Sequence, residues 1–255
     1  MRIEDAALKI PIRELENNPY ASIICYPKLA KTELRKRLKE LQKLKVYALE
    51  FSGEKEAFNI PVLGKGCVGI VVIAYVDGEK AALKIRRVDA DRSNMRMEAE
   101  MLKKANSVGV GPKLLGFSKN FLLMQYVEGD LLPTWLEKTV EKMRVKMVLR
   151  EILEQCWRLD MAGLDHGELS HAPKHVVVND EDKPFILDFE SASINRKPSN
   201  VTSICQFLFI SGLVAEKVAE KIGVREKKTI IEALRVYKAD KRRENFEKIL
   251  AACGL

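Results

Sequence analysis

All three histidines of the chain fall within one short segment, His166-Gly167-Glu168-Leu169-Ser170-His171-Ala172-Pro173-Lys174-His175. An apolar run, Phe185-Ile186-Leu187, follows shortly afterwards and leads directly into Asp188 and Glu190. Carboxylates can accept a proton or hold a hard metal ion, and imidazole can accept a proton or bind a softer metal ion. The gathering of these side-chain types in a single region therefore indicates a chemical site.

A glycine-rich segment lies earlier in the chain, where residues 64–71 match the pattern G-x-G-x-x-G-x-V. Glycines at this spacing allow a tight turn and let backbone N–H groups approach phosphate oxygens closely. A dinucleotide-binding turn would have to open a helix, but Gly69 is followed by a β-branched run that predicts a strand. A P-loop is excluded because no G-K-[ST] ends the motif. An ordinary glycine hairpin stays open at this point.

A lysine that could contact phosphates follows on the next predicted strand. Residues 76–79 have the composition of a tight hairpin turn, and Lys84 lies on the strand that returns from it. A buried ammonium needs a carboxylate partner, which the predicted helix over 92–106 offers as Glu98 or Glu100. These two lie about 200° apart around the helix, so only one can face Lys84, and we favour Glu98. The alternative is an unrelated surface lysine and surface glutamate.

Together these features resemble a known family. The ordered set of glycine loop, lysine, glutamate, His-Gly-Glu-Leu-Ser and Leu-Asp-Phe-Glu is similar to the motifs of the protein-kinase superfamily, including its H-R-D and D-F-G pair. It most resembles the compact microbial branches that include RIO kinases, Bud-type kinases and lipopolysaccharide kinases. The resemblance covers about residues 60–195. It implies a bilobal α+β fold and an atypical, archaeal-type serine/threonine kinase.

The resemblance also implies roles for individual residues. Lys84, Glu168 and Asp188 would be catalytic: Glu168 would accept or orient the proton of the substrate hydroxyl, and Asp188 would hold Mg²⁺ on ATP. Glu98 would hold Lys84, and Ala82 would line the adenine pocket. The full nucleotide-binding set would be Gly64, Gly66, Gly69, Val71, Ala82, Lys84, Glu98, Gln125, Tyr126 and Val127, the last three forming the hinge.

Two positions depart from the kinase pattern. Glu168 replaces the usual aspartate, and Pro173 stands where a metal-binding asparagine is expected. Lys174 or His175 would have to take over the asparagine's role, and an imidazole ligand favours Mn²⁺ over Mg²⁺. These departures leave open a nucleotide-binding pseudokinase or an ATPase switch that acts through a protein or RNA partner.

The histidines allow two further interpretations. His171 and His175 have the spacing of a helical zinc site, although Pro173 disfavours that helix and no third ligand is near. His166 is expected to be structural, because in the family that the chain resembles this ring supports the Asp-Phe-Glu turn. No A-P-E motif follows Asp188, so regulation through an activation loop is not expected.

The elements that must position these residues suggest three parts. Residues 1–57 would form an N-terminal helical segment, either a winged-helix-like unit or a helix packed on its neighbour. Its helix, near 31–45, places Leu34, Leu38 and Leu41 on one face, with Thr32 as N-cap. Residues 58–127 would form a β-rich N-lobe, and 128–255 a reduced α-helical C-lobe.

Bulk properties limit the remaining choices. The five cysteines are scattered without a C-x-x-C pair, which favours reduced thiols in a cytoplasmic protein. No signal peptide is visible, and no apolar stretch approaches the roughly 20 residues of a membrane span. The acceptor of the phosphoryl group would be a protein or a small-molecule hydroxyl.

A net charge of +8 favours an anionic partner, and RNA is one candidate. Because no aromatic residues interleave the basic ones, solvated basic faces are the preferred interpretation. The residues concerned are Arg35, Lys36, Arg37, Lys39, Lys43 and Lys45 in the first segment, and Lys238, Lys241, Arg242 and Arg243 near the C-terminus.

Overall fold

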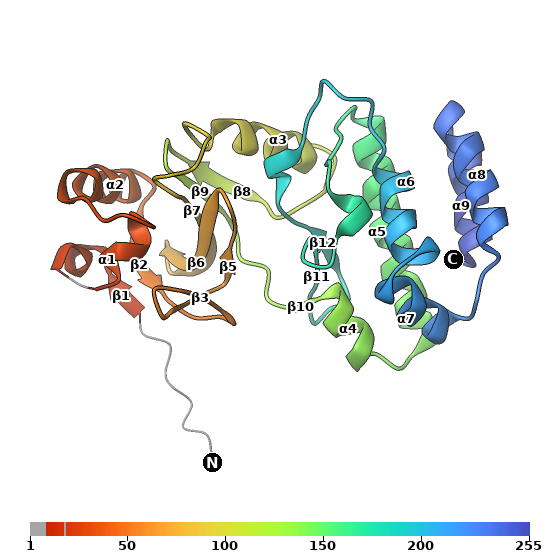
Figure 1. The fold of residues 1–255 in the computed structure, drawn as a ribbon, viewed down its shortest axis with the longest axis horizontal. Coiled ribbons are helices and arrows are strands. Elements are labelled where there is room, and N and C mark those ends of the chain that lie inside the picture. The colour runs from red at the N-terminus through yellow and green to blue at the C-terminus, as the bar shows by residue number, and fades with distance from the viewer. Residues whose placement is uncertain (1–8, 18) are drawn as a thin grey trace, which may run out of the picture. The chain divides into compact units, whose positions relative to one another are not determined.

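The computed structural model describes residues 9–17 and 19–255 and divides into two compact units (Figure 1). The first comprises the chain up to Glu100 together with Lys113–Tyr126, and the second comprises Met101–Pro112 and Val127–Leu255. The first is built on an antiparallel sheet, and the second is mostly helical. The predicted α+β class is confirmed. The predicted division at residues 57 and 127 stays a prediction.

The sheet of the first unit is antiparallel and has the strand order β1-β2-β6-β7-β9-β8, with β5 added on β6. The hairpin of β6 and β7 forms because a β-branched run is followed by Asp77 and Gly78, whose φ angles of 51° and 91° suit a tight turn. The strands are β1 (Lys9–Pro11), β2 (Val46–Glu50), β5 (Gly64–Lys65), β6 (Gly69–Val76), β7 (Glu79–Arg86), β8 (Leu114–Phe117) and β9 (Phe121–Gln125), besides a separate hairpin of β3 (Lys55–Ala57) and β4 (Ile60–Val62).

The helix expected near 31–45 is α2 (Lys31–Lys43), which buries Leu34 and Leu41 as its apolar spacing predicts. Its N-cap is Ala30, so the expectation of Thr32 as N-cap is wrong. The same segment supplies β1 and β2, which join the main sheet through β6. The remaining helices here are the 3₁₀ turn η1 (Ile12–Asn17), α1 (Ala21–Ile24) and α3 (Arg96–Asn106), which begins in this unit.

Arg37 differs from its basic neighbours on α2, because its side chain is fully buried. Its guanidinium donates to the carbonyl oxygens of Ile24 and Arg86 at 2.7 and 2.6 Å and to Asn120 Oδ1 at 3.1 Å. The inclusion of Arg37 in a possible RNA-binding face is therefore wrong. Its charge fixes α2 against the sheet.

The second unit packs its helices around α5 (Lys142–Met161), whose apolar face includes Leu149, Ile152 and Leu153, all fully buried. A small antiparallel sheet, in the order β10-β11-β12, carries the loops that contain the histidines and Asp188. The other elements are β10 (Asp130–Leu131), α4 (Leu132–Lys138), η2 (Leu169–His171), β11 (Val176–Val178), β12 (Pro184–Ile186), η3 (Phe189–Ser191), α6 (Asn200–Cys205), the π-helical turn η4 (Gln206–Ile210), α7 (Leu213–Ile222), α8 (Lys227–Ala239) and α9 (Arg243–Cys253).

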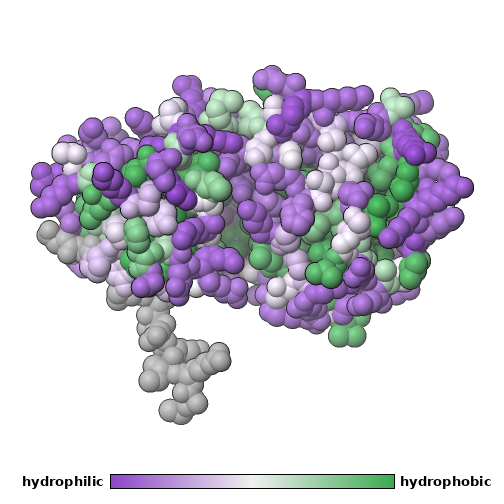
Figure 2. All heavy atoms as spheres, viewed as in Figure 1, coloured by the Kyte–Doolittle hydropathy of each residue, from purple (hydrophilic) through white to green (hydrophobic). Residues whose placement is uncertain are grey.

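Hydrophilic side chains cover most of the face seen in Figure 2, with smaller hydrophobic groups between them. Among the described residues, no single helix has both the length and the apolar character needed to cross a bilayer. One bent pair, Asn200–Ile210 with Leu213–Ile222, reaches that threshold on length and composition alone.

Candidate functional site

The glycine-rich loop connects β5 to β6 in the first unit. The Gly66 N–H donates to the carbonyl oxygen of Gly69 at 2.8 Å, which closes the turn. A Cβ on Gly69 would lie 3.0 Å from the Ile85 carbonyl oxygen and 3.1 Å from Lys84 Cγ, so β7 leaves no room for a side chain there. At Gly64 and Gly66 a Cβ would meet nothing closer than 3.5 Å. Packing within the chain thus explains Gly69, whereas the other two expose bare backbone.

Lys84 and Glu98 form a buried ion pair. Lys84 lies on β7 opposite Val71, and its Nζ donates to Glu98 Oε1 at 2.8 Å. The side chains are only 8% and 4% exposed. Glu98 lies in the first turn of α3, whereas Glu100 pairs with Arg96 at the surface. The choice of Glu98 from helical phase is confirmed.

The predicted hinge lies at the end of β9. Ala82, the predicted adenine-pocket residue, is buried on β7 and pairs with Met124. The Gln125 N–H donates to the Lys113 carbonyl oxygen at 2.8 Å and is thus used within the sheet. Tyr126 is the last residue of the first unit, and Val127 opens the next part of the second. The predicted hinge thus falls where the chain passes from the first unit to the second.

His166 is a structural residue of the second unit. It is fully buried, and its Nε2 lies 3.0 Å from the Leu187 carbonyl oxygen, so Nε2 carries the proton. The ring stacks edge-on against Phe189, with 5.1 Å between centroids. Burial lowers the pKa of His166 below its ordinary value of 6.5. The ring supports the Asp188-Phe189-Glu190 turn, as expected from the sequence.

Gly167 is required next to this histidine. Its φ is 93°, and a Cβ there would lie 2.6 Å from Arg196 Nη2 and 2.9 Å from the Ser191 carbonyl oxygen. Both a left-handed backbone and close packing therefore demand glycine between His166 and Glu168.

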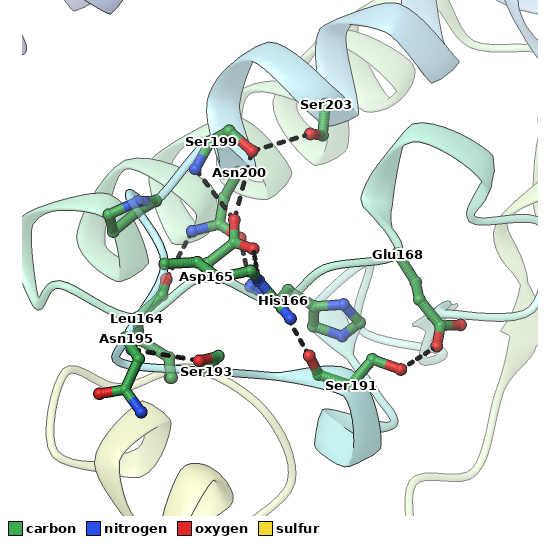
Figure 3. Close-up of polar contacts among 12 residues, drawn as sticks. Leu164, Asp165, His166, Glu168, Ser191, Ser193, Asn195, Ser199, Asn200 and Ser203 are labelled. Atoms are coloured by element: carbon green, nitrogen blue, oxygen red, sulfur yellow. Dashed lines mark hydrogen bonds and ion pairs between the residues drawn. The ribbon is translucent and has the colours of Figure 1, made fainter.

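Glu168 is held at both carboxylate oxygens. Ser191 Oγ donates to Oε1 in a short hydrogen bond, shown in Figure 3. Oε2 lies 3.1 Å from His175 Nε2, and His175 is buried whereas the Glu168 side chain is 41% exposed. Sequence reasoning missed Ser191, which lies 23 residues from Glu168 and offers no signal besides its hydroxyl group. The arrangement orients an accessible carboxylate, as a proton acceptor requires.

Asp188 follows β12 and has a left-handed backbone, with φ 67° and ψ 74°. This conformation costs a non-glycine residue roughly 1–2 kcal/mol, and such costs concentrate at functional sites. Within the described residues, no three histidine, cysteine, aspartate or glutamate side chains gather so as to hold a metal by themselves. A carboxylate that shares a metal with substrate phosphates fits the usual binding of Mg²⁺.

The two other histidines do not lie on one helix. His171 ends the short turn η2 and is exposed, whereas His175 is buried and directed at Glu168. The helical zinc site considered from the sequence is therefore not formed.

Asn200 anchors the backbone around His166 and was not found from the sequence. Its Oδ1 accepts the His166 N–H at 2.8 Å, and its Nδ2 donates to the Leu164 carbonyl oxygen at 2.7 Å (Figure 3). Asn200 Nδ2 also donates to Asp160 Oδ1 at 2.8 Å. Asp165 adds a second support, because it accepts from Arg196 at 2.9 Å. Residues 164–166 are thus fixed by groups more than thirty residues away.

Comparison with known proteins agrees with this geometry. Residues 46–204 match the family model described as RIO domain. An uncharacterized protein, MJ1211, of Methanocaldococcus jannaschii is 30% identical over 117 residues, which are 45% of this chain and 98% of that protein. The KEOPS complex subunit Bud32 of Pyrococcus abyssi is 29% identical over 165 residues, 63% of this chain and 68% of that protein.

Proposed function

Since this chain belongs to the RIO-domain family of atypical kinases and ATPases, we propose that it transfers the γ-phosphoryl group of ATP to the hydroxyl of a serine or threonine side chain. ATP and a divalent metal ion are what this family uses in general. The serine or threonine acceptor and the roles of individual residues below are parts of the proposal.

The buried Lys84–Glu98 pair carries the proposal. A buried ion pair rarely stabilises a fold more than apolar side chains of the same volume would, so its presence calls for another reason. Here the lysine lies next to the glycine turn, since a Cβ on Gly69 would come within 3.1 Å of Lys84 Cγ. An ammonium fixed beside a glycine-rich turn suits the phosphates of a nucleotide. The phosphate side of this nucleotide site would be completed by Gly64, Gly66 and Val71. The adenine would contact Ala82 and the hinge at Gln125–Val127.

In the second unit Glu168 would accept the proton of the attacking hydroxyl. Ser191 and His175 hold one carboxylate oxygen each, and both oxygens retain lone pairs for the substrate. Asp188 would hold the metal ion, which neutralises phosphate charge when bound. Because His175 Nε2 already faces Glu168, we assign His175 to positioning that carboxylate and keep Asp188 as the metal ligand. An oxygen ligand favours Mg²⁺, although Mn²⁺ would also bind.

A transfer assay with radiolabelled ATP, Mg²⁺ or Mn²⁺ and a generic protein acceptor tests the proposal. We expect D188N and E168Q to lose at least about a hundredfold in rate, as removal of electrostatic or proton-transfer groups does elsewhere. The exposed E181Q variant, in the loop between β11 and β12, serves as the control and should match the wild type. Wild-type rates in D188N would refute the assignment.

A second candidate, an ATPase switch in a protein assembly, has one observation in its favour. The proposed base is a glutamate whose two oxygens already have partners, and Pro173 stands five residues after it, where a metal-binding asparagine is expected. The Bud32 relative is a subunit of the KEOPS complex. Phosphate release from ATP without labelling of any protein or small-molecule acceptor would favour the switch. The cysteine composition leads us to place either activity in the cytoplasm.

A further inference from the structure

The basic cluster near the C-terminus does not present four available charges. Arg243 donates to both oxygens of Glu154, at 2.6 and 2.7 Å, and also pairs with Glu247. Arg242 pairs with Asp240 at 2.5 Å. With two of its four charges neutralised by carboxylates, the cluster is a poor surface for the phosphates of RNA.

The other two members of the cluster, Lys238 and Lys241, instead line a cavity of about 260 Å³ within the second unit, together with Lys197. Lys197 comes from the loop before α6, Lys238 from the end of α8, and Lys241 from the connection to α9. Residues far apart in the sequence thus bring three ammonium groups to one hollow. The rest of the lining is Asp160, Pro198, Ser199, Thr202 and Tyr237.

The single carboxylate in the lining, that of Asp160, already accepts hydrogen bonds from the protein. Asp160 accepts the Asn200 N–H at 2.9 Å, Asn200 Nδ2 at 2.8 Å and the Tyr237 hydroxyl at 2.9 Å. Lys241 lies 3.8 Å from the same carboxylate and donates to the Pro198 carbonyl oxygen. Three ammonium groups against one carboxylate leave the lining with a charge of +2.

The donors left for a ligand are mainly the ammonium groups. Ser199 Oγ donates to Asp165 at 3.2 Å, and Thr202 Oγ1 donates to the Ser199 carbonyl oxygen at 2.8 Å. In the part of the chain that the structure describes, Lys197 and Lys238 have no carboxylate within 4.0 Å. A neutral polar molecule would find few donors here, whereas a dianion would match both the charge and the donor type.

We propose that this pocket binds the phosphate group of a small phosphate monoester. The volume lies below the roughly 300–1,000 Å³ of pockets that enclose a whole drug-sized ligand. It therefore suits a phosphate with a short attached fragment and excludes an enclosed nucleotide. Its lining includes none of Lys84, Glu168 and Asp188, and the proposal does not depend on the proposed kinase activity.

Calorimetric titration of the full chain with ribose 5-phosphate tests this, with ADP and Mg²⁺ present in excess to occupy a nucleotide site. The pocket variant is K197Q/K238Q. The matched control is K227Q/K228Q, which removes two exposed lysines from the start of the same helix α8. We expect one-to-one binding by the wild type and the control, and binding at least about tenfold weaker in the pocket variant, since ion-paired phosphate contacts dominate such sites. Ribose should not bind.

Equal affinity of the pocket and control variants, at matching melting temperatures, would overturn the proposal. So would the absence of binding up to about 10 mM, an affinity too weak for a formed site. Inorganic phosphate that binds as tightly as ribose 5-phosphate would overturn the ester assignment, because the attached fragment would then contribute nothing.

Discussion

The ion pair between Lys84 and Glu98 allows stability and activity to be separated in one set of variants. The pair is 2.8 Å long and almost wholly buried. Replacing only one partner breaks a buried ion pair, which costs about 3–5 kcal/mol of unfolding free energy. Replacing both partners by apolar side chains of similar volume removes both charges, and is often neutral or stabilising by about 1–4 kcal/mol.

The variants K84M, E98L and K84M/E98L make up this cycle. Urea unfolding followed by circular dichroism should show both single variants destabilised and the double variant within about 1 kcal/mol of the wild type or above it. Phosphoryl transfer should fall at least about a hundredfold in all three, because each lacks a fixed ammonium for the phosphates. The double variant is decisive, since at wild-type stability a loss of transfer cannot come from unfolding.

Two results would refute this reasoning. A double variant that transfers phosphate at the wild-type rate would show that the pair is structural. A double variant no more stable than the less stable single variant would show that the fold needs both charges and that apolar side chains cannot replace the pair.

Three further predictions follow from the described contacts. E168D moves the carboxylate back by about 1.5 Å, one carbon–carbon bond, so the contacts with Ser191 and His175 should be lost. Phosphoryl transfer should slow about tenfold or more while the KM for ATP stays unchanged, and faster transfer would contradict this. R37M leaves two buried carbonyl oxygens without their donor and should lower the unfolding free energy by about 3 kcal/mol, measured against the exposed K36M. Because burial lowers the pKa of His166, the unfolded chain takes up the proton first as pH falls, so stability is full above pH 6.5 and decreases below it, by up to about 1.4 kcal/mol per pH unit. H166Q should flatten this slope in urea titrations from pH 7.5 to 5, and the exposed H171Q should not.

Features coded by neighbouring residues were predictable from the sequence. A β-branched run and an Asp-Gly turn fix the hairpin of β6 and β7, and helical phase allows only one of Glu98 and Glu100 to face Lys84. Arg37 was also predictable, because it lies three residues after Leu34 and four before Leu41, on the apolar face of α2. Because Arg37 is charged, it was assigned to an exposed face, although its spacing from Leu34 and Leu41 indicates a buried position.

Contacts between distant segments were not predictable in the same way. Ser191 lies 23 residues from Glu168, and Asn200 lies 34 residues from His166. Neither pair has a fixed spacing imposed by a single helix or strand, since loops lie between its two members. Hydroxyl and amide side chains are also common at turns, so residue type alone gives no signal. Only the folded second unit brings them together.

The two departures from the kinase pattern are best understood as one change. Considered from the sequence, Glu168 and the missing asparagine were separate reasons to doubt catalysis. In the folded chain Glu168 accepts from His175, a residue beyond the position of that asparagine. A glutamate has one more rotatable bond than an aspartate and so loses more side-chain freedom when it is fixed. Ser191 and His175 supply two contacts that fix it. The longer acid and the histidine therefore compensate each other, and this favours an oriented base over a degenerate site.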